Sequence, residues 1–376
     1  MKKSLCWILV LLALAMTLSG CASPSAPAAT QKPTATPVTA DPQRFSIMYL
    51  DTFDTIIQLI GFAENKETFD RIAESAHKSF QHLHKLFDAY NDYTDEGIVS
   101  VYTLNQRAAL EPVQVDPVLM DLLVFCRERQ LTLHNTVNVA MGSVLSIWHD
   151  YREAGLDDPA QAQLPPIDAL KDAAQHVSMD DVVLDEEKCT VFFRDPAVKL
   201  DVGSVAKGYA AEFVARQLTA SAMPSFIISA GGNVRVGAPP KDGRSAWGIG
   251  VQKPEGYALS TSQDDLLETF YVADMSVVTS GDYQRYYVVD GKRYHHLIDP
   301  GTLMPGEFYR AVTILTADSG LADMLSTTAF LLPYEESRAL IDSLEGVEAL
   351  WVMPDESIVM TDGAKALAKS QGAKAL

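Results

Sequence analysis

The chain has 376 residues, of which 47% are hydrophobic and 21% are charged, so it is long and apolar enough to form a substantial core. Its formal net charge of −19 excludes the basic surface on which nucleic-acid-binding proteins depend. The four cysteines show no CxxC pair and no histidines at zinc-finger spacing, which excludes a structural zinc site.

The first 20 residues have the pattern of an export signal. Lys2 and Lys3 precede the apolar run Leu5–Leu18, and the sequence LSGC then ends at Cys21. Small residues before a cysteine resemble the lipobox of bacterial lipoproteins, which implies cleavage before Cys21 and acylation of that cysteine, with palmitate as the expected lipid. The alternative is an ordinary cleaved signal peptide in which Cys21 has no role.

Residues 21–43 are rich in Pro, Ala and Thr and predict a disordered tether. No other apolar run is long enough to span a bilayer. We therefore expect an exported protein, held by a lipid anchor on the outer side of the bacterial cytoplasmic membrane, which is the periplasmic face in a Gram-negative cell.

The folded part is expected to begin near residue 44. Phe45–Phe62 predicts one or two strands, and Glu67–Tyr90 predicts a helix with one apolar side. Pro117–His134 predicts a second helix. The apolar stretch Val137–Trp148 follows, and the polar, proline-bearing stretch Asp150–Leu170 predicts a surface excursion.

A strand-to-helix junction carries the first candidate site. Thr190–Leu200 predicts a strand, and apolar residues recur at helical spacing after Gly203. Asp201, Ser204 and Lys207 are spaced to share the first two turns of that helix. A helix start attracts phosphate, a lysine adds charge, and hard oxygens suit Mg²⁺. The alternative is that Asp201 is only an N-cap and Lys207 only a solvated side chain.

Pro224–Pro240 predicts two strands joined by a Gly-Gly step. Paired glycines suit a sharp turn or a close approach to the backbone. Asn233 and Arg235 would present polar side chains beside this step.

The dipeptide Asp290-Gly291 predicts a hairpin with a type I′ turn. His295 and His296 lie at its end and should face opposite sides, so only one belongs to a given site. The inward-facing histidine is a candidate general base, and the alternative is a pair of structural histidines. Ser280–Asp282 predicts a turn before the hairpin.

Ala317–Leu332 predicts a late helix with Asp323 and Thr327 on one face. A carboxylate and a hydroxyl at this spacing can both face one Mg²⁺, although a threonine bonded to its own helix is a common alternative. Ala349–Thr361 predicts a further hairpin, and Asp362–Leu376 predicts a poorly ordered tail.

These elements predict an α+β fold, namely a single mixed domain of β-sheets with packed helices over residues 44–362, followed by a tail at 363–376. The sequence contains no GxGxxG and no Walker motif, so nothing supports a Rossmann or nucleotide-triphosphatase fold.

Five motifs in order resemble those of one family. They are DVGSVAKGYAA at Asp201–Ala211, SAGGNVRVG at Ser229–Gly237, TSGDYQRYY at Thr279–Tyr287, YHHLIDPGTLMP at Tyr294–Pro305 and ADMLSTTAF at Ala322–Phe330. The chain is similar in these motifs to the ApbE-like family of FAD:protein FMN transferases, which are exported bacterial enzymes often made as lipoproteins. The resemblance extends over nearly all of Phe45–Thr361.

The resemblance implies a reaction with FAD as substrate and Mg²⁺ as cofactor. FAD is split at its pyrophosphate, FMN is joined to a Thr or Ser hydroxyl of an acceptor protein, and AMP leaves. Mg²⁺ would neutralise the pyrophosphate.

The resemblance also assigns roles by motif position. The metal would be held by Asp323 and Thr327 with a contribution from Ser204, and His296 would accept the proton of the attacking hydroxyl. The implied FAD contacts are Leu50, Tyr90, Asn138, Val139, Ala140, Met141, Asp201, Lys207 and Leu297.

The chain departs from the family pattern at three positions. Asn138 replaces the usual Asp, Ala140 replaces the usual Thr, and Ser204 stands where relatives often have Gly, Ala or Thr. The segment around Tyr90 varies between members that transfer FMN and members that hydrolyse FAD. Two alternatives therefore remain, a Mg²⁺-dependent FAD pyrophosphatase and a non-catalytic flavin-binding lipoprotein.

Overall fold

The computed structural model describes residues 41–254 and 263–375. The predicted signal peptide, the predicted acylation site Cys21 and nearly all of the predicted tether lie outside these residues. Within the described part, none of the helices combines the length and the apolar character needed to cross a bilayer.

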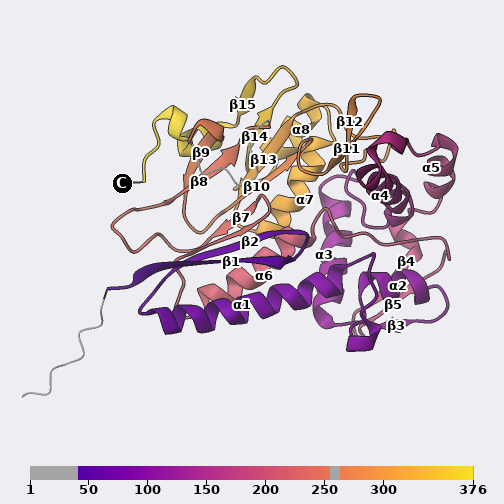
Figure 1. The fold of residues 1–376 in the computed structure, drawn as a ribbon, viewed down its shortest axis with the longest axis horizontal. Helices are drawn as coiled ribbons and strands as arrows, with labels where there is room; N and C mark the ends of the chain where they lie inside the picture. Colours follow the sequence, from indigo (N-terminus) through magenta and orange to yellow (C-terminus); the bar gives the residue numbers. More distant parts are fainter. Residues whose placement is uncertain (1–40, 255–262, 376) are drawn as a thin grey trace, which may run out of the picture. The chain divides into compact units, whose positions relative to one another are not determined.

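An eight-stranded antiparallel sheet forms the centre of the described fold (Figure 1). In spatial order its strands are β1 (Gln43–Thr52), β2 (Thr55–Ala63), β6 (Phe226–Ala230), β7 (Asn233–Val236), β10 (Ser276–Gly281), β13 (Ala311–Thr316), β14 (Glu348–Val352) and β15 (Ile358–Met360). The one or two strands predicted at residues 45–62 form two, β1 and β2, which pair antiparallel. The two strands predicted at residues 224–240 and the hairpin predicted at residues 349–361 are confirmed as antiparallel pairs.

Four helices pack along one face of this sheet. They are α1 (Lys66–Phe87), α6 (Ala206–Thr219), α7 (Ser319–Phe330) and α8 (Tyr334–Asp342), and each contacts the next (α1 with α6, α6 with α7, α7 with α8). Burial alternates along β13, where Val312 and Ile314 face α7 while Leu315 belongs to the core on the opposite face. Because both faces are covered, every residue of β13 is buried.

The opposite face carries β8 (Trp247–Gln252), β9 (Leu266–Val272) and the short helix α9 (Asp362–Leu367). The expectation of a poorly ordered tail after residue 362 is therefore wrong. Thr361 caps α9, and Ala364 and Ala368 are fully buried against this core. Ala368 also forms a backbone bridge to Phe270. The contact is made by two small alanines, which carry no strong sequence signal for burial.

Two smaller groups of elements complete the described fold. The helices α2 (Val101–Arg107) and α3 (Pro117–Thr132) join the small sheet β3 (Val113–Gln114), β5 (Thr190–Phe193) and β4 (Val182–Asp185) in the core beneath α1 and α6. The helices α4 (Gly142–Asp157) and α5 (Ile167–Ala173) pack with the hairpin β11 (Tyr286–Val289) and β12 (Lys292–His295) around a separate core.

Three local expectations differ from the structure. The predicted surface excursion at 150–170 begins inside α4 and contains part of α5. In the predicted turn Ser280–Asp282, Ser280 and Gly281 instead end strand β10, and the turn begins at Asp282. The helix α6 begins at Ala206, so Asp201 lies too early in the chain to be its N-cap. The backbone of Asp201 instead bonds to a neighbouring segment, with Asp201 N donating to Val139 O at 2.8 Å.

Candidate active site

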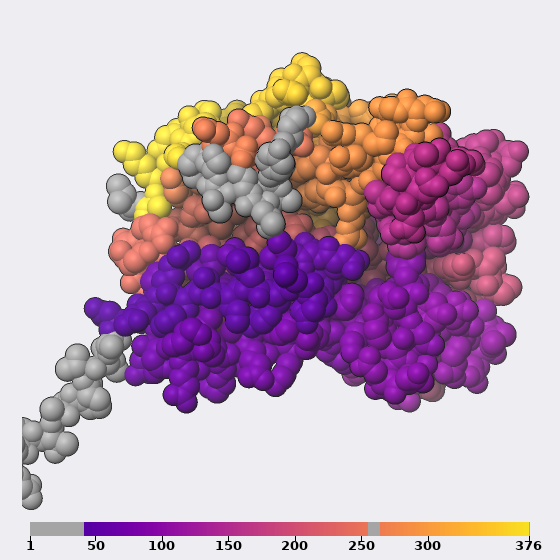
Figure 2. Space-filling view, viewed as in Figure 1, coloured from indigo at the N-terminus to yellow at the C-terminus, as the bar shows by residue number. Residues whose placement is uncertain are grey.

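A cavity of about 630 Å³ opens where the large sheet meets α4 and the hairpin β11–β12. Figure 2 shows the β1–β2 hairpin (indigo), α4 (magenta) and the β11–β12 segment (orange) meeting on one face of the molecule. Ten of the site residues predicted from the sequence line this cavity, namely Tyr90, Asn138, Met141, Asp201, Ser204, Lys207, His296, Leu297, Asp323 and Thr327. Its volume is in the range of cofactor-binding pockets.

One wall of the cavity is the contact between α6 and α7. Gly208 N donates a hydrogen bond of 2.7 Å to Oδ2 of Asp323. A Cβ atom at Gly208 would lie 2.3 Å from the carbonyl oxygen of Ser319 and 2.4 Å from Cβ of Asp323, so only glycine allows this approach. The close approach places Lys207, the residue before this glycine, beside Asp323.

Lys207 faces the cavity without an ion-pair partner among the described residues. Burial lowers the pKa of its ammonium group and Arg285 acts in the same direction, while the charge of Asp323 opposes both. Burial likewise raises the pKa of the Asp323 carboxyl, and the Lys207 charge opposes this. A phosphate in the cavity would give Lys207 a direct ion-pair partner in addition to the nearby charge of Asp323.

The residues around Asp323 offer a small set of oxygen ligands. Thr327 lies one helical turn further along α7, and its Oγ1 is 3.3 Å from Oγ of Ser280. The Asn233 amide nitrogen is buried and makes no hydrogen bond of ordinary geometry. It is nevertheless close enough to the Asp323 carboxylate to oppose the rise in the pKa of that group. Among the described residues, no group of three His, Cys, Asp or Glu side chains could hold a metal by itself.

These oxygen donors can hold Mg²⁺ only if a bound substrate supplies further ligands. Mg²⁺ is commonly bound by one or two carboxylates together with substrate phosphates and water, and the cavity supplies one carboxylate and neighbouring hydroxyls. Asp323 and Thr327 would therefore hold the ion in a complex with a phosphate-bearing ligand.

The two adjacent histidines face different surroundings. His296 lines the large cavity, and its Nδ1 lies 3.2 Å from the carbonyl oxygen of Arg285. A carbonyl can only accept, so Nδ1 carries the proton and Nε2 keeps its lone pair. Burial lowers the pKa of His296 well below its usual range, and the charges of Arg285 and Lys207 add to this effect.

His295 is buried and borders a smaller cavity of about 210 Å³. Its Nε2 donates to Gly306 O at 2.8 Å, and its Nδ1 accepts from Leu297 N at 3.3 Å. The prediction that the two histidines face different sides is confirmed. His295 holds the backbone that carries His296 and Leu297.

Tyr90 and Asp201 form a second wall of the cavity. The Tyr90 hydroxyl donates to Oδ2 of Asp201 at 2.6 Å, and its ring stacks on His149 with centroids 3.9 Å apart. Oδ1 of Asp201 accepts from Gly203 N. Burial and the neighbouring carboxylate both raise the pKa of Tyr90. Asp201 is therefore engaged on both oxygens in this structure.

The segment from Asn138 to Met141 runs beside the backbone of Lys199. Asn138 donates to the carbonyl of Val177 at 2.6 Å, a bond that the aspartate usual in the family could not make when ionised. Val139 and Ala140 are fully buried in the core beneath the cavity and are not among its lining residues.

Leu50 also lies away from the cavity lining. It is 75% exposed on β1, whereas Asp54 in the turn after that strand does line the cavity.

Several lining residues were not predicted as site residues, notably Arg285, Asn233, His149, Arg152, Trp148 and Thr279. Arg285 and Thr279 lie inside the motif TSGDYQRYY, and Asn233 lies in the Gly-Gly motif, so position within a motif was the available signal. His149 and Arg152 lie on α4, and Arg152 lies in the stretch 150–170 that was expected to be surface.

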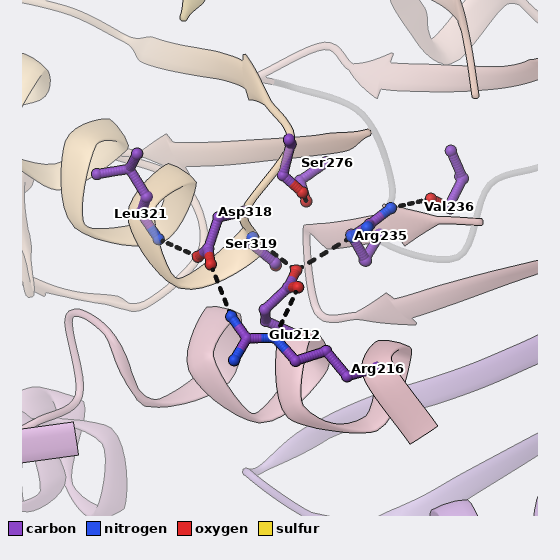
Figure 3. A network of polar contacts seen from close by, with 9 residues as sticks. Glu212, Arg216, Arg235, Val236, Ser276, Asp318, Ser319 and Leu321 are labelled. Atoms are coloured by element: carbon purple, nitrogen blue, oxygen red, sulfur yellow. Dashed lines mark hydrogen bonds and ion pairs between the residues drawn. The ribbon is translucent and has the colours of Figure 1, made fainter. Parts of the chain in front are cut away.

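A polar network centred on the buried Glu212 joins the elements of the cavity wall (Figure 3). Glu212 on α6 accepts from Nε of Arg235 on β7 at 3.1 Å and from the backbone N–H of Ser319 at the start of α7, also at 3.1 Å. Arg216 bridges Glu212 to Asp318, the N-cap of α7. The network therefore ties together the three elements that carry Lys207, Asn233 and Asp323.

Comparison with known proteins gives consistent results. Residues 52–351 match the ApbE family. An FAD:protein FMN transferase of Treponema pallidum is 36% identical over 276 residues, which cover 69% of this chain and 72% of that protein. One from Klebsiella pneumoniae is 28% identical over 263 residues, covering 69% and 77% respectively.

Solved structures share the fold. The ApbE protein of Thermotoga maritima superimposes with a TM-score of 0.73 at 25% identity, covering 86% of this chain and 99% of that one. The flavinyl transferase ApbE of Pseudomonas stutzeri gives a TM-score of 0.70 at 20% identity, covering 89% and 98%. The α+β fold predicted from the sequence is thereby confirmed.

Proposed function

The chain belongs to the ApbE family, and from this premise we propose that it is an FAD:protein FMN transferase. The observation that carries the proposal is the junction of α6 and α7, which brings Lys207 and Asp323 into the same cavity as His296. A cation, a carboxylate able to bind a metal and a neutral imidazole are groups that an enzyme can use for phosphoryl transfer from a pyrophosphate.

The proposed reaction moves one phosphorus centre between two oxygens. The hydroxyl oxygen of an acceptor Thr or Ser bonds to the phosphorus of the FMN half of FAD. The bond from that phosphorus to the bridging oxygen breaks, and AMP leaves with this oxygen. The hydroxyl proton goes to Nε2 of His296, so atoms and charge balance.

His296 suits the role of base because its other nitrogen is occupied. With Nδ1 donating to Arg285 O, the free lone pair of Nε2 is the one that can take a proton. Its lowered pKa keeps the ring neutral at pH 7 in the free protein. The pyrophosphate would offset the charges of Lys207 and Arg285, which raises the basicity of His296 when substrate is bound.

We propose that Lys207 and Arg285 bind the pyrophosphate and that Asp323 and Thr327, with Ser204 nearby, hold Mg²⁺. Bound there, Mg²⁺ would neutralise negative charge on the pyrophosphate and on the departing AMP. Tyr90, Asn138, Met141, Asp201 and Leu297 would surround the rest of FAD.

We further propose a cellular setting, which rests on the sequence. The signal peptide and the lipobox-like LSGC support export and acylation at Cys21. The enzyme would then meet acceptor proteins on the outer side of the cytoplasmic membrane.

The test is mass spectrometry of the products. The purified chain is incubated with FAD, MgCl₂ and the flavin-free soluble domain of a bacterial redox protein that carries FMN on a threonine. We expect the acceptor to gain the mass of FMN less one water, with an equal amount of AMP released and with EDTA blocking both. AMP and free FMN without an adduct would identify a pyrophosphatase, and intact FAD would leave only a flavin-binding protein.

A further inference from the structure

Strand β1 is an exposed edge of the large sheet. Among the described residues it pairs only with β2, in regular register from Gln43 to Tyr49. The outer backbone groups of such a strand can pair with another chain, and proteins usually guard them with charged side chains, proline or a very short strand. The charged residues of β1 are Arg44 and Asp51, near its two ends, and the stretch between them, Phe45–Leu50, contains no charged residue and no proline.

The side chains of β1 divide into two sets. Phe45, Ile47 and Tyr49 pack against the core beneath the sheet. Met48 and Leu50 point to the other side and are 61% and 75% exposed. Two large apolar side chains at alternate positions on a free edge are the pattern by which sheets recognise an added strand.

The opposite edge of the same sheet is different. β15 has only three residues, Ile358–Met360, and the chain passes directly from it into α9. A short edge strand offers few free backbone groups. The edge at β1 therefore has the features of a docking edge, and the edge at β15 has those of a protected edge.

β1 also leads to the cavity. The turn that follows it contains Asp54, which lines the cavity, and Arg285 of the cavity wall donates to the carbonyl of Phe53 at 3.1 Å. β1 ends at Thr52, and Phe53 and Asp54 form the turn that follows, both with positive φ. An extended segment advances about 3.3 Å per residue, so the four steps from Met48 to Thr52 correspond to about 13 Å of strand. A chain lying along β1 would reach the cavity mouth within one ordinary strand length.

We propose that the acceptor protein binds by adding an extended segment to the free edge of β1 as a ninth strand. This inference rests on the proposed flavin transfer, because that reaction requires a protein to present a hydroxyl at the cavity. Apolar side chains at alternate positions of the segment would cover Met48 and Leu50, and the hydroxyl-bearing residue would lie just beyond the paired stretch, past Asp54.

The test compares Met48→Lys with Ile358→Lys. Both residues are exposed apolar side chains, on β1 and on the opposite edge strand β15. Rates of FMN transfer are measured against the concentration of the flavin-free redox domain named above. Loss of one buried apolar contact corresponds to about a tenfold weaker association, so we expect Met48→Lys to raise KM for the acceptor about tenfold. KM for FAD and the rate of AMP release without acceptor should not change, and Ile358→Lys should match the wild type.

Other results would overturn the proposal. An unchanged acceptor KM in Met48→Lys, with normal transfer by the wild type, would refute the docking edge and leave the transferase intact. A raised KM for FAD would show that β1 serves the FAD site. A dimer of wild type that Met48→Lys dissociates in light scattering would make a second copy of the chain the occupant. Absence of transfer by the wild type would overturn the transferase and this inference together.

Discussion

Replacing Gly208 with alanine tests whether the close contact of α6 and α7 builds the site. The added Cβ would lie 2.3 Å from the Ser319 carbonyl oxygen, about 1 Å short of ordinary van der Waals contact. The obstacle is backbone, so no side chain can rotate away. The two helices must separate, and the hydrogen bond from Gly208 N to Asp323 must lengthen.

The size of the effect follows from three contributions. Overpacking a well-packed contact costs about 1–3 kcal/mol, and a hydrogen bond to a charged group contributes about 1.5–3 kcal/mol. Alanine regains about 1 kcal/mol through its higher helix propensity. We therefore expect Gly208→Ala to lower the free energy of unfolding by about 1.5–5 kcal/mol.

The assay is urea unfolding followed by tryptophan fluorescence, together with the rate of FMN transfer at saturating FAD. Gly320→Ala, on the facing helix α7, is the matched control. There the new Cβ would meet Oδ1 of Asp318 at 3.3 Å and Cα of Tyr209 at 3.4 Å, which small shifts can accommodate. We expect the control to stay within about 1 kcal/mol of wild type.

The activity measurement adds a separate criterion. Gly208→Ala should slow transfer because Lys207 and Asp323 would no longer keep their spacing. A variant as stable as the wild type, or one that transfers flavin at the wild-type rate, would refute the argument that this contact positions the site.

Three further predictions concern single groups. Asp323→Ala should abolish transfer and AMP release while leaving much of the FAD affinity, measured by flavin fluorescence; full activity would make the metal assignment wrong. His296→Ala should impair transfer more than FAD binding. Because the pKa of His296 is lowered, kcat/KM of wild type should fall only below pH 6.5 as the ring gains a proton, and a midpoint at or above 6.5 would contradict the assigned base. Glu212→Ala removes the partner of the buried Arg235 and should lower the free energy of unfolding in urea by about 3–5 kcal/mol. Arg216→Ala changes a side chain that is 72% exposed and should lower it by less than about 1 kcal/mol. Equal losses in the two variants would refute the role given to the network.

The elements predicted well were those with strong local signals. The turn Asp290-Gly291 has positive φ at both residues, as a type I′ turn requires, and the hairpin forms around it. The helix predicted over Ala317–Leu332 forms as α7, which begins after its N-cap Asp318 and buries its apolar residues. Such features depend on neighbouring residues and can be read from sequence.

The elements predicted poorly depend on distant contacts. Asp201 followed by Gly203 resembles a helix start, yet its backbone is held by Val139, more than sixty residues earlier. Ser280-Gly281 resembles a turn, yet it pairs with Val312 and Ala311 as part of β10. In both cases long-range hydrogen bonds outweigh local preference.

The site was predictable to the extent that it lies in motifs. Lys207, Asp323 and His296 were named from residue chemistry and resemblance, and they line one cavity. Their mutual arrangement was not predictable, because it depends on a close approach at Gly208 that only the packed helices reveal. His149 was missed because a stacking partner for Tyr90 has no pattern of its own.

The two walls of the cavity belong to different hydrophobic cores. Lys207 and Asp323 lie on helices packed against the large sheet, whereas Met141, Trp148 and Ile298 belong to the separate core of α4, α5 and the β11–β12 hairpin. Each wall of the cavity is therefore held by its own core, and a substitution inside one core should disturb the wall that this core supports more than the opposite wall.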